Sequence, residues 1–163
     1  MKSFFYLLLL TIMTSCHNYH VLKTGLEGST IPAIDLQLTD SITHVNTANL
    51  SNGKATVLFF FQPYCPFCRA QTVDIVSNIK ELSGIHFCLL TNASMDQIRS
   101  YEREYGLQKF SNITVARDTS LNFAKYFNAK IVPYIAVYNP NEKLQKVLIG
   151  RADVKDIKNI ALE

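Results

Sequence analysis

The sequence contains no run of lysine or arginine, no internal repeat and no low-complexity stretch. Its formal net charge of +3 is spread thinly over 163 residues, so we expect no basic stripe that would bind nucleic acid. The apolar content of 48% is too high for a disordered chain and ordinary for a globular core. Length and composition together indicate one globular domain.

The sequence also lacks an apolar run long enough to form a transmembrane helix. The apolar run near the start, from Phe4 to Met13, covers about ten residues, half of the roughly 20 that a transmembrane helix needs. Lys2 precedes this run and small residues follow it. This arrangement is typical of a secretory signal peptide rather than of a permanent membrane span.

The residues after the apolar run, Met13-Thr14-Ser15-Cys16, resemble the lipobox of bacterial lipoproteins. The resemblance implies a signal peptide over residues 1–15, a lipid on Cys16, a flexible tether over residues 16–27 and a domain over residues 28–163. The protein would then be anchored to a membrane by its lipid and face the periplasm of the bacterial cell envelope. The alternative is a plain signal peptide followed by an incidental cysteine.

Cysteine is scarce: the chain has only Cys16, Cys65, Cys68 and Cys88. Their contexts differ too much for a uniform disulfide framework. Cys65 and Cys68 are separated by two residues, which suits half of a zinc site, a structural disulfide or a redox dithiol. No second pair of ligands lies at zinc-finger spacing, and a disulfide closing so small a loop would add little stability. A redox dithiol is therefore the prediction.

Strand-like and helix-like patterns alternate along the rest of the chain. Apolar residues recur at helical spacing after Cys65, Ser94-x-x-Gln97 forms a capping box, and Asp118 and Asp153 can cap two further helices. We expect strands over residues 33–38, 56–61, 85–90, 112–116, 134–138 and 143–149, a helix over residues 66–82, and three helices after the other caps. This order predicts an α/β fold with a mixed sheet.

The dithiol falls at the junction between the apolar strand over 56–61 and the next helix. Cys65 at the start of that helix would meet the positive end of the helix dipole, and Pro66 suits the first helical position. Arg69 adds a positive charge nearby. These features favour a thiolate at Cys65. Cys68, inside the first turn, would resolve a mixed disulfide formed at Cys65.

Cys88 lies within the apolar stretch His86-Phe87-Cys88-Leu89-Leu90. A free cysteine in such a stretch behaves as a small apolar residue, so we expect it to be buried. His86 is expected to be a packed, hydrogen-bonded histidine rather than a ligand.

Several motifs together resemble the thioredoxin superfamily, and within it the TlpA/ResA-like (AhpC/TSA-redoxin-like) group of membrane-tethered thiol–disulfide oxidoreductases. They are Asn52-Gly53-Lys54, the stretch VLFFFQPYCPFCRAQ over residues 57–71, and Ile131-Val132-Pro133. The resemblance implies a thioredoxin-like fold with helices on both faces of the sheet, an N-terminal strand extension and a helix–strand insertion over about residues 94–116.

The same resemblance assigns roles to residues around the dithiol. Pro133 takes the place of the family's cis-proline, and Val132 would offer backbone hydrogen bonds to a bound partner. Tyr64 and Phe67 flank the thiols and would contact the partner, while Pro66 and Phe67 would tune the redox potential. The expected partners are protein thiols and disulfides of the envelope and an electron donor or acceptor there, with no cofactor and no metal.

The sequence also departs from the family pattern. It has no tryptophan, and Tyr64 precedes the first cysteine where many relatives have that residue. Phe59 and Gln71 stand where some relatives have an acid, so the proton acceptor for Cys68 is unassigned. Asp74 lies one helical turn after Gln71 and is expected to solvate an exposed helix face.

Three other functions are considered. A peroxidase of the peroxiredoxin type has a Thr-x-x pattern before its reactive cysteine, whereas this chain has Gln62-Pro63-Tyr64. A copper chaperone of the Sco type has two cysteines separated by three residues, and a distant histidine, whereas Cys65 and Cys68 are separated by two. A silent binding module would not need both thiols. The pattern therefore favours thiol–disulfide exchange but does not indicate the direction of electron flow.

Overall fold

The computed structural model describes residues 19–163. The predicted signal peptide (1–15) and Cys16 lie outside the described residues. The strands are β1 (Tyr19–Leu22), β2 (Asp35–Leu38), β3 (His44–Asn46), β4 (Ala55–Phe60), β5 (Ile85–Thr91), β6 (Ile113–Arg117), β7 (Tyr134–Tyr138) and β8 (Leu144–Gly150). The helices are α1 (Pro66–Ser77), α2 (Met95–Tyr105), α3 (Asn122–Phe127) and α4 (Val154–Leu162), with short 3₁₀ turns at Thr47–Asn49 and Leu107–Lys109.

The strands form one sheet in the order β1-β8-β7-β4-β5-β6-β2-β3. The β4–β5 and β5–β6 pairs are parallel, whereas β7 pairs antiparallel with both β4 and β8. The predicted mixed sheet is thus confirmed, with β4 in its centre. The predicted insertion corresponds to α2 and β6.

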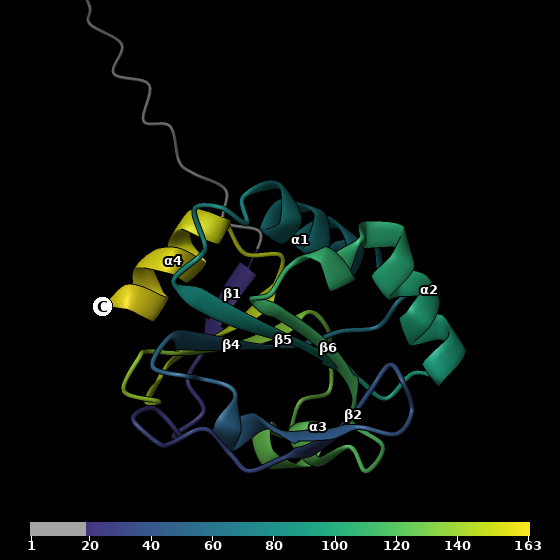
Figure 1. Cartoon of the computed structure of the whole chain (residues 1–163). Helices are drawn as coiled ribbons and strands as arrows, with labels where there is room; N and C mark the ends of the chain where they lie inside the picture. The colour runs from purple at the N-terminus through teal and green to yellow at the C-terminus, as the bar shows by residue number, and fades with distance from the viewer. Residues whose placement is uncertain (1–18) are drawn as a thin grey trace, which may run out of the picture.

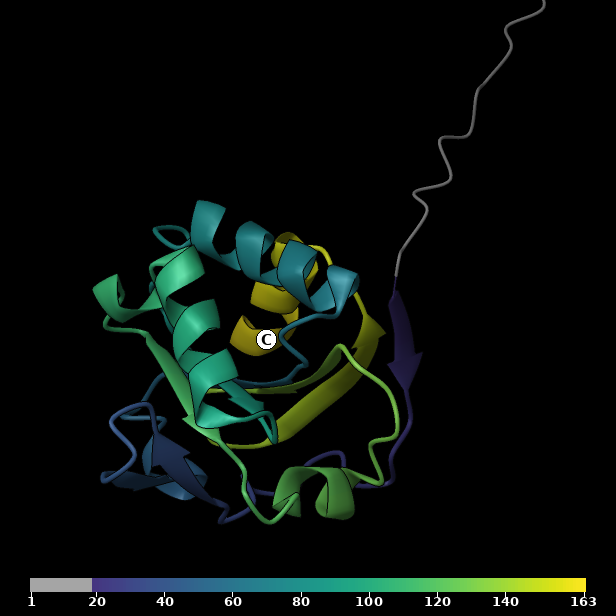
Figure 2. The same cartoon turned by 90° about the vertical axis from the view of Figure 1, so that its right-hand side faces the viewer.

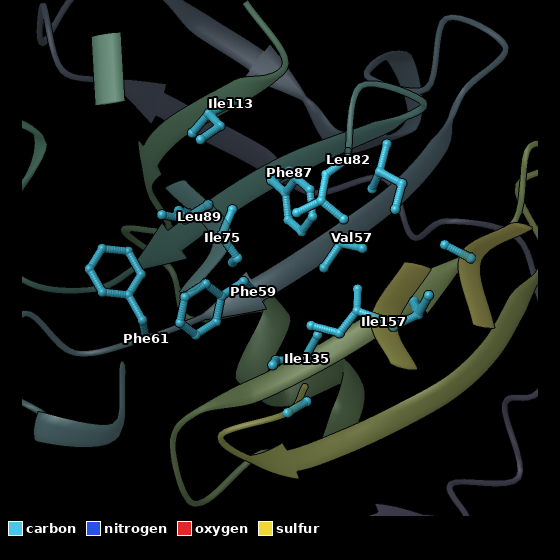
Figure 3. Packing of buried hydrophobic residues seen from close by; sticks show 14 of the residues in the cluster. Val57, Phe59, Phe61, Ile75, Leu82, Phe87, Leu89, Ile113, Ile135 and Ile157 are labelled. Atoms are coloured by element: carbon cyan, nitrogen blue, oxygen red, sulfur yellow. The ribbon is translucent and has the colours of Figure 1, made fainter. Parts of the chain in front are cut away.

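Helices cover both faces of the sheet, as predicted: α1, α2 and α4 lie on one face and α3 on the other (Figure 1). All six residues of β4 are buried, and its side chains alternate between the two cores. Val57 and Phe59 face the helices α1, α2 and α4, whereas Leu58 and Phe60 face α3. Figure 3 shows the first core, where Phe59 lies among Ile75, Phe87 and Ile135.

The predicted capping residues act as expected. Ser94 and Gln97 form a complete capping box at α2, and the Asp153 side chain accepts a hydrogen bond from the Lys155 N–H at α4. The Asp118 carboxylate accepts from the N–H groups of Asn122 and Phe123 at 3.0 and 2.8 Å, so it caps α3. These local bonds explain why the sequence pattern located the starts of α2 and α4, whereas α3 begins four residues after Asp118, with Leu121 at its N-cap position.

Three elements differ from the prediction. The expected tether includes Tyr19–Leu22, yet these residues form β1, which pairs antiparallel with β8. The α1 helix ends at Ser77 rather than near Leu82, because the chain turns at Asn78, although Leu82 is still buried. β3 was not predicted, because its segment has no clear hydrophobic period. Its strand conformation comes from antiparallel pairing with β2.

Candidate active site

Cys65 sits where the central strand passes into the first helix. The chain leaves β4, and the N–H of Cys65 donates to the carbonyl of Gln62 at 3.0 Å. Cys65 is the N-cap of α1, and Pro66 occupies the first helical position, as predicted. Because β4 is buried on both faces, this junction is held firmly at one end of the sheet.

Cys65 is partly exposed, and its sulfur faces two backbone groups. It accepts a hydrogen bond from the Cys68 N–H at 3.4 Å and lies 4.0 Å from the carbonyl oxygen of Val132. The first contact and the helix dipole both stabilise negative charge on the sulfur. The geometry therefore places Cys65, rather than the buried Cys68, where a partner can meet it.

Cys68 has the opposite surroundings. It is fully buried, and this burial raises the pKa of its thiol well above the ordinary value. The hydrogen bond to Cys65 raises the same pKa further. Cys68 thus stays protonated at neutral pH and lies behind Cys65, one helical turn into α1, which suits a resolving thiol.

The loop before β7 completes the site. The Val132–Pro133 bond is cis, as the family resemblance implied, and Pro133 is buried. Around the sulfur, Tyr64, Phe67 and Ile131 expose 75%, 62% and 59% of their surface. Ile131 is part of the Ile131-Val132-Pro133 motif, but the sequence analysis assigned it no role, although its position directly before Val132 and Pro133 is a signal for one.

Arg69 does not act as the free positive charge that the sequence suggested. Its guanidinium pairs with the Glu104 carboxylate of α2, which raises the pKa of Arg69. The same group lies 5.5 Å from the centre of the Tyr105 ring and donates to the Pro63 carbonyl at 3.4 Å. Arg69 therefore connects α1 to α2, and its charge is largely neutralised there.

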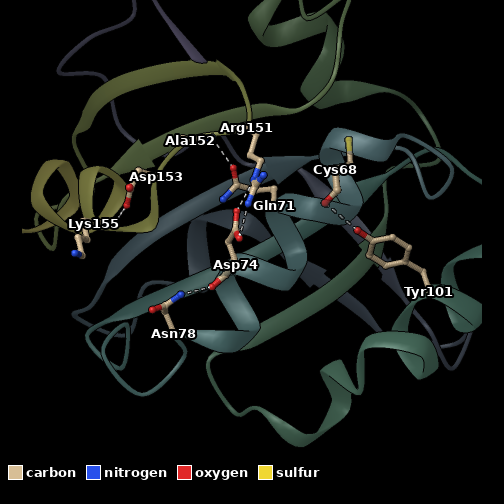
Figure 4. Close-up of polar contacts among 9 residues, drawn as sticks. All are labelled: Cys68, Gln71, Asp74, Asn78, Tyr101, Arg151, Ala152, Asp153 and Lys155. Carbon is tan, nitrogen blue, oxygen red and sulfur yellow. Dashed lines mark hydrogen bonds and ion pairs between the residues drawn. The ribbon is translucent and has the colours of Figure 1, made fainter. Parts of the chain in front are cut away.

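Gln71 and Asp74 face the chain between β8 and α4 (Figure 4). The buried Gln71 side chain accepts a hydrogen bond from the Ala152 N–H at 2.7 Å. The Asp74 carboxylate accepts two bonds from the Arg151 guanidinium, at 2.6 and 2.8 Å. The prediction that Asp74 solvates an exposed face is wrong, because Arg151, 77 positions later, folds back onto it.

Tyr101 of α2 contacts the dithiol helix in a way that the sequence analysis missed. Its hydroxyl donates to the Cys68 carbonyl at 3.3 Å and is paired with the Thr72 hydroxyl at 2.7 Å. Both side chains are buried, and burial raises the pKa of Tyr101. Tyr101 follows Ile98 at helical spacing, and both are buried on the inner face of α2, but no local signal indicates the bond of Tyr101 to Cys68.

Cys88 is separated from the dithiol by the sheet. It is fully buried in the core on the α3 face, whereas Cys65 and Cys68 belong to the core on the α1 face. Burial raises the pKa of Cys88 to about 12. His86 is hydrogen-bonded to the Thr114 hydroxyl at 3.0 Å, so both predictions for this strand are confirmed.

Within residues 19–163, no group of three or more histidine, cysteine, aspartate or glutamate side chains is arranged to hold a metal ion. In the same part of the chain, no helix has the length and apolar character needed to cross a bilayer.

Residues 28–147 match the model of the AhpC/TSA family. The chain belongs to this family. The AhpC/TSA match covers the dithiol, the insertion and the cis-proline loop. A curated relative, protein disulfide-isomerase 2-3 of Arabidopsis thaliana, is 35% identical over 111 residues, which are 67% of this chain and 23% of that protein. The chain thus spans less than a quarter of that relative's length.

Solved structures share the fold of this AhpC/TSA protein at low sequence identity. A protein of Chlorobium tepidum assigned as thiol:disulfide interchange protein DsbE has a TM-score of 0.68 and 16% identity, covering 84% of this chain and 98% of its own. A secreted disulfide oxidoreductase of Mycobacterium tuberculosis has a TM-score of 0.64 and 18% identity, covering 79% and 95%. The thioredoxin-like fold is confirmed, and fold, dithiol and family agree with the predicted thiol–disulfide oxidoreductase.

Proposed function

We propose that this protein is a thiol–disulfide oxidoreductase of the bacterial cell envelope that exchanges its Cys65–Cys68 pair with protein partners. The observation that carries the proposal is the contrast between the two sulfurs. Cys65 is partly exposed at a helix start, whereas Cys68 is fully buried one turn later. One thiol can therefore attack, and the other can resolve.

The exchange follows from this division. The Cys65 thiolate attacks one sulfur of a partner disulfide, forms a mixed disulfide and releases the partner's other sulfur as a thiolate. Cys68 then loses its proton and attacks the Cys65 sulfur, which forms the Cys65–Cys68 disulfide and releases the second partner sulfur. Two electrons pass to the partner, and the reverse sequence oxidises a partner dithiol.

The partner-binding surface surrounds Cys65. Val132 would hydrogen-bond through its backbone to an extended partner segment beside Pro133, while Tyr64, Pro66 and Phe67 would contact the partner's side chains. This assignment is supported by the exposure of Tyr64 and Phe67 and by the short approach of Cys65 to Val132. The exposed Ile131 extends the same apolar surface.

Location in the envelope is supported by the signal-like sequence before Cys16. The M. tuberculosis protein with the same fold is itself described as secreted. A lipid on Cys16 would hold the protein on a membrane, as the Met13-Thr14-Ser15-Cys16 pattern suggests. Several acyl chains would be needed, because a single chain anchors a protein only marginally.

The test compares two single variants in cells. Cys68→Ser should accumulate mixed disulfides with partner proteins, because Cys65 attacks the partner and no second thiol resolves the mixed disulfide. Cys65→Ser should accumulate few. The matched control is Cys88→Ser, which removes a thiol on the far face of the sheet and should leave reduction of insulin by the purified protein unchanged. Equal trapping by Cys65→Ser and Cys68→Ser would refute the division of labour.

A further inference from the structure

The first strand fixes where the start of the domain lies relative to the dithiol. β1 begins at Tyr19, whose register partner is Gly150 at the end of β8. The Gly150 N–H donates to the Pro133 carbonyl at 2.9 Å. Pro133 follows Val132, whose carbonyl lies 4.0 Å from the Cys65 sulfur. An unbroken series of contacts therefore joins Tyr19 to the reactive thiol.

The strand order gives the same result. β1, β8 and β7 are neighbours, so Tyr19 lies two strand spacings, about 10 Å, from the start of β7. Figure 2 shows β1 (purple) on the side of the molecule where α1 begins. Tyr19 also packs against the core to which Cys65 and Val132 contribute. Its hydroxyl donates to Asp156 of α4 at 2.9 Å, which holds this end of β1 in place.

The distance from the proposed lipid to this strand is short. Cys16 and Tyr19 are three residues apart, and a fully extended chain spans about 11 Å over three residues. A compact domain of this length has a radius of gyration of about 15 Å. The link to the lipid is therefore shorter than the domain is wide, and it attaches at the dithiol end of the sheet.

We propose that the dithiol end of the domain faces the membrane, so that Cys65 exchanges with partner cysteines presented at the membrane surface. This inference rests on the proposed lipid anchor at Cys16. In this arrangement the domain does not swing freely on a long tether, and the reactive sulfur stays close to the bilayer. A partner whose cysteines lie far above the bilayer would not be reached.

The orientation can be measured on the full lipidated chain in phospholipid vesicles. A fluorescent maleimide is attached to Cys65 in one sample and to Asn141→Cys in a Cys65→Ser background in the other. Asn141 is the matched position, because it is exposed in the β7–β8 turn at the opposite end of the sheet. A nitroxide on the lipid headgroups should quench the label at Cys65 several-fold more strongly than the label at position 141.

A second variant tests the short link itself. A Gly/Ser linker of about 30 residues between Asn18 and Tyr19, with a root-mean-square length of about 30 Å, should lower quenching at Cys65 toward the value at position 141. Equal or stronger quenching at position 141 in the unmodified chain would overturn the orientation. Unchanged quenching at Cys65 in the linker variant would overturn it as well.

A missing lipid anchor and a wrong orientation give different results. Mass spectrometry of the same preparation shows whether Cys16 carries lipid, and absence of lipid would overturn both the anchor and the orientation. Lipid on Cys16 with the reverse quenching order would overturn the orientation alone. Insulin reduction by the unlabelled protein tests the dithiol chemistry independently of both.

Discussion

The two thiols of the dithiol lie in different surroundings. Cys65 is partly exposed at a helix start, and Cys68 lies behind it in the core. Desolvation of the charged form raises the pKa of the Cys68 thiol, so this thiol stays protonated at neutral pH. The contrast in burial supports the order of the two exchange steps that we propose.

Cys88 provides a test of this burial effect away from the active site. Its pKa is about 12 in the folded protein and about 9.0 for an unburied thiol. Below pH 9 the thiol is protonated in both states. Above pH 9 the unfolded chain releases this proton and the folded chain does not, so Cys88 lowers the free energy of unfolding by about 1.4 kcal/mol per pH unit, up to about pH 12.

We therefore expect the stability difference between the wild type and Cys88→Ala to change with pH. At pH 8 the variant should be the less stable protein, because it loses packed volume in the core. Between pH 9 and pH 10 its disadvantage should shrink by about 1 kcal/mol. Urea unfolding of both reduced proteins measures this, and a difference that stays constant with pH would contradict the prediction.

At the scale of elements, α2 of the insertion braces the start of the dithiol helix. The ion pair between Arg69 and Glu104 joins the helices, and so does the Tyr101 hydroxyl, which donates to the Cys68 carbonyl and is paired with the Thr72 hydroxyl. The ion pair is largely exposed, so its contribution to stability is modest, about 0–1 kcal/mol. The buried Tyr101 bond is the stronger contact, because its loss leaves buried polar groups without a partner.

Tyr101→Phe should lower the free energy of unfolding by about 1–2 kcal/mol, since it removes the hydroxyl that joins Thr72 to the Cys68 carbonyl. Tyr64→Phe is the matched control, because it removes the same hydroxyl from a side chain that is 75% exposed. The control should change stability by less than about 0.5 kcal/mol. Urea unfolding compares the two, and an equally small effect of both would show that the Tyr101 bond does not brace α1.

At the scale of the whole molecule, β1 belongs to the domain and covers one edge of the sheet. It pairs with β8 over four residues and brings Tyr19 to the core. Without it, β8 would become an exposed edge with unpaired backbone groups. The folded unit thus begins before the boundary at residue 28 that the sequence suggested.

A chain that starts at Lys23 should therefore be less stable than one that starts at Asn18. The loss of about four backbone hydrogen bonds predicts a decrease of roughly 2–4 kcal/mol in the free energy of unfolding. The shorter chain should still reduce insulin under conditions in which it is folded, because the dithiol and its loop are intact. Equal midpoints in urea for the two chains would show that β1 adds nothing to the fold.

The sequence by itself determined the dithiol, most of the elements and their order. Local interactions explain this success: Pro66 after Cys65, the Ser94–Gln97 capping box and the mostly apolar β4 each act within a few residues of the chain. Neighbours in sequence decide such features, so a local pattern can indicate them. The cis bond before Pro133 was obtained only through the family resemblance.

Only the tertiary structure decided the contacts between distant segments. Arg151 reaches Asp74 across 77 positions, Tyr101 reaches Cys68 across 33, and Tyr19 meets Gly150 at the dithiol end of the sheet. None of these partners is indicated by periodicity or spacing, because each contact depends on how the sheet brings separate elements together. The place of the first strand beside the reactive thiol, on which the proposed membrane orientation depends, is a property of the folded sheet alone.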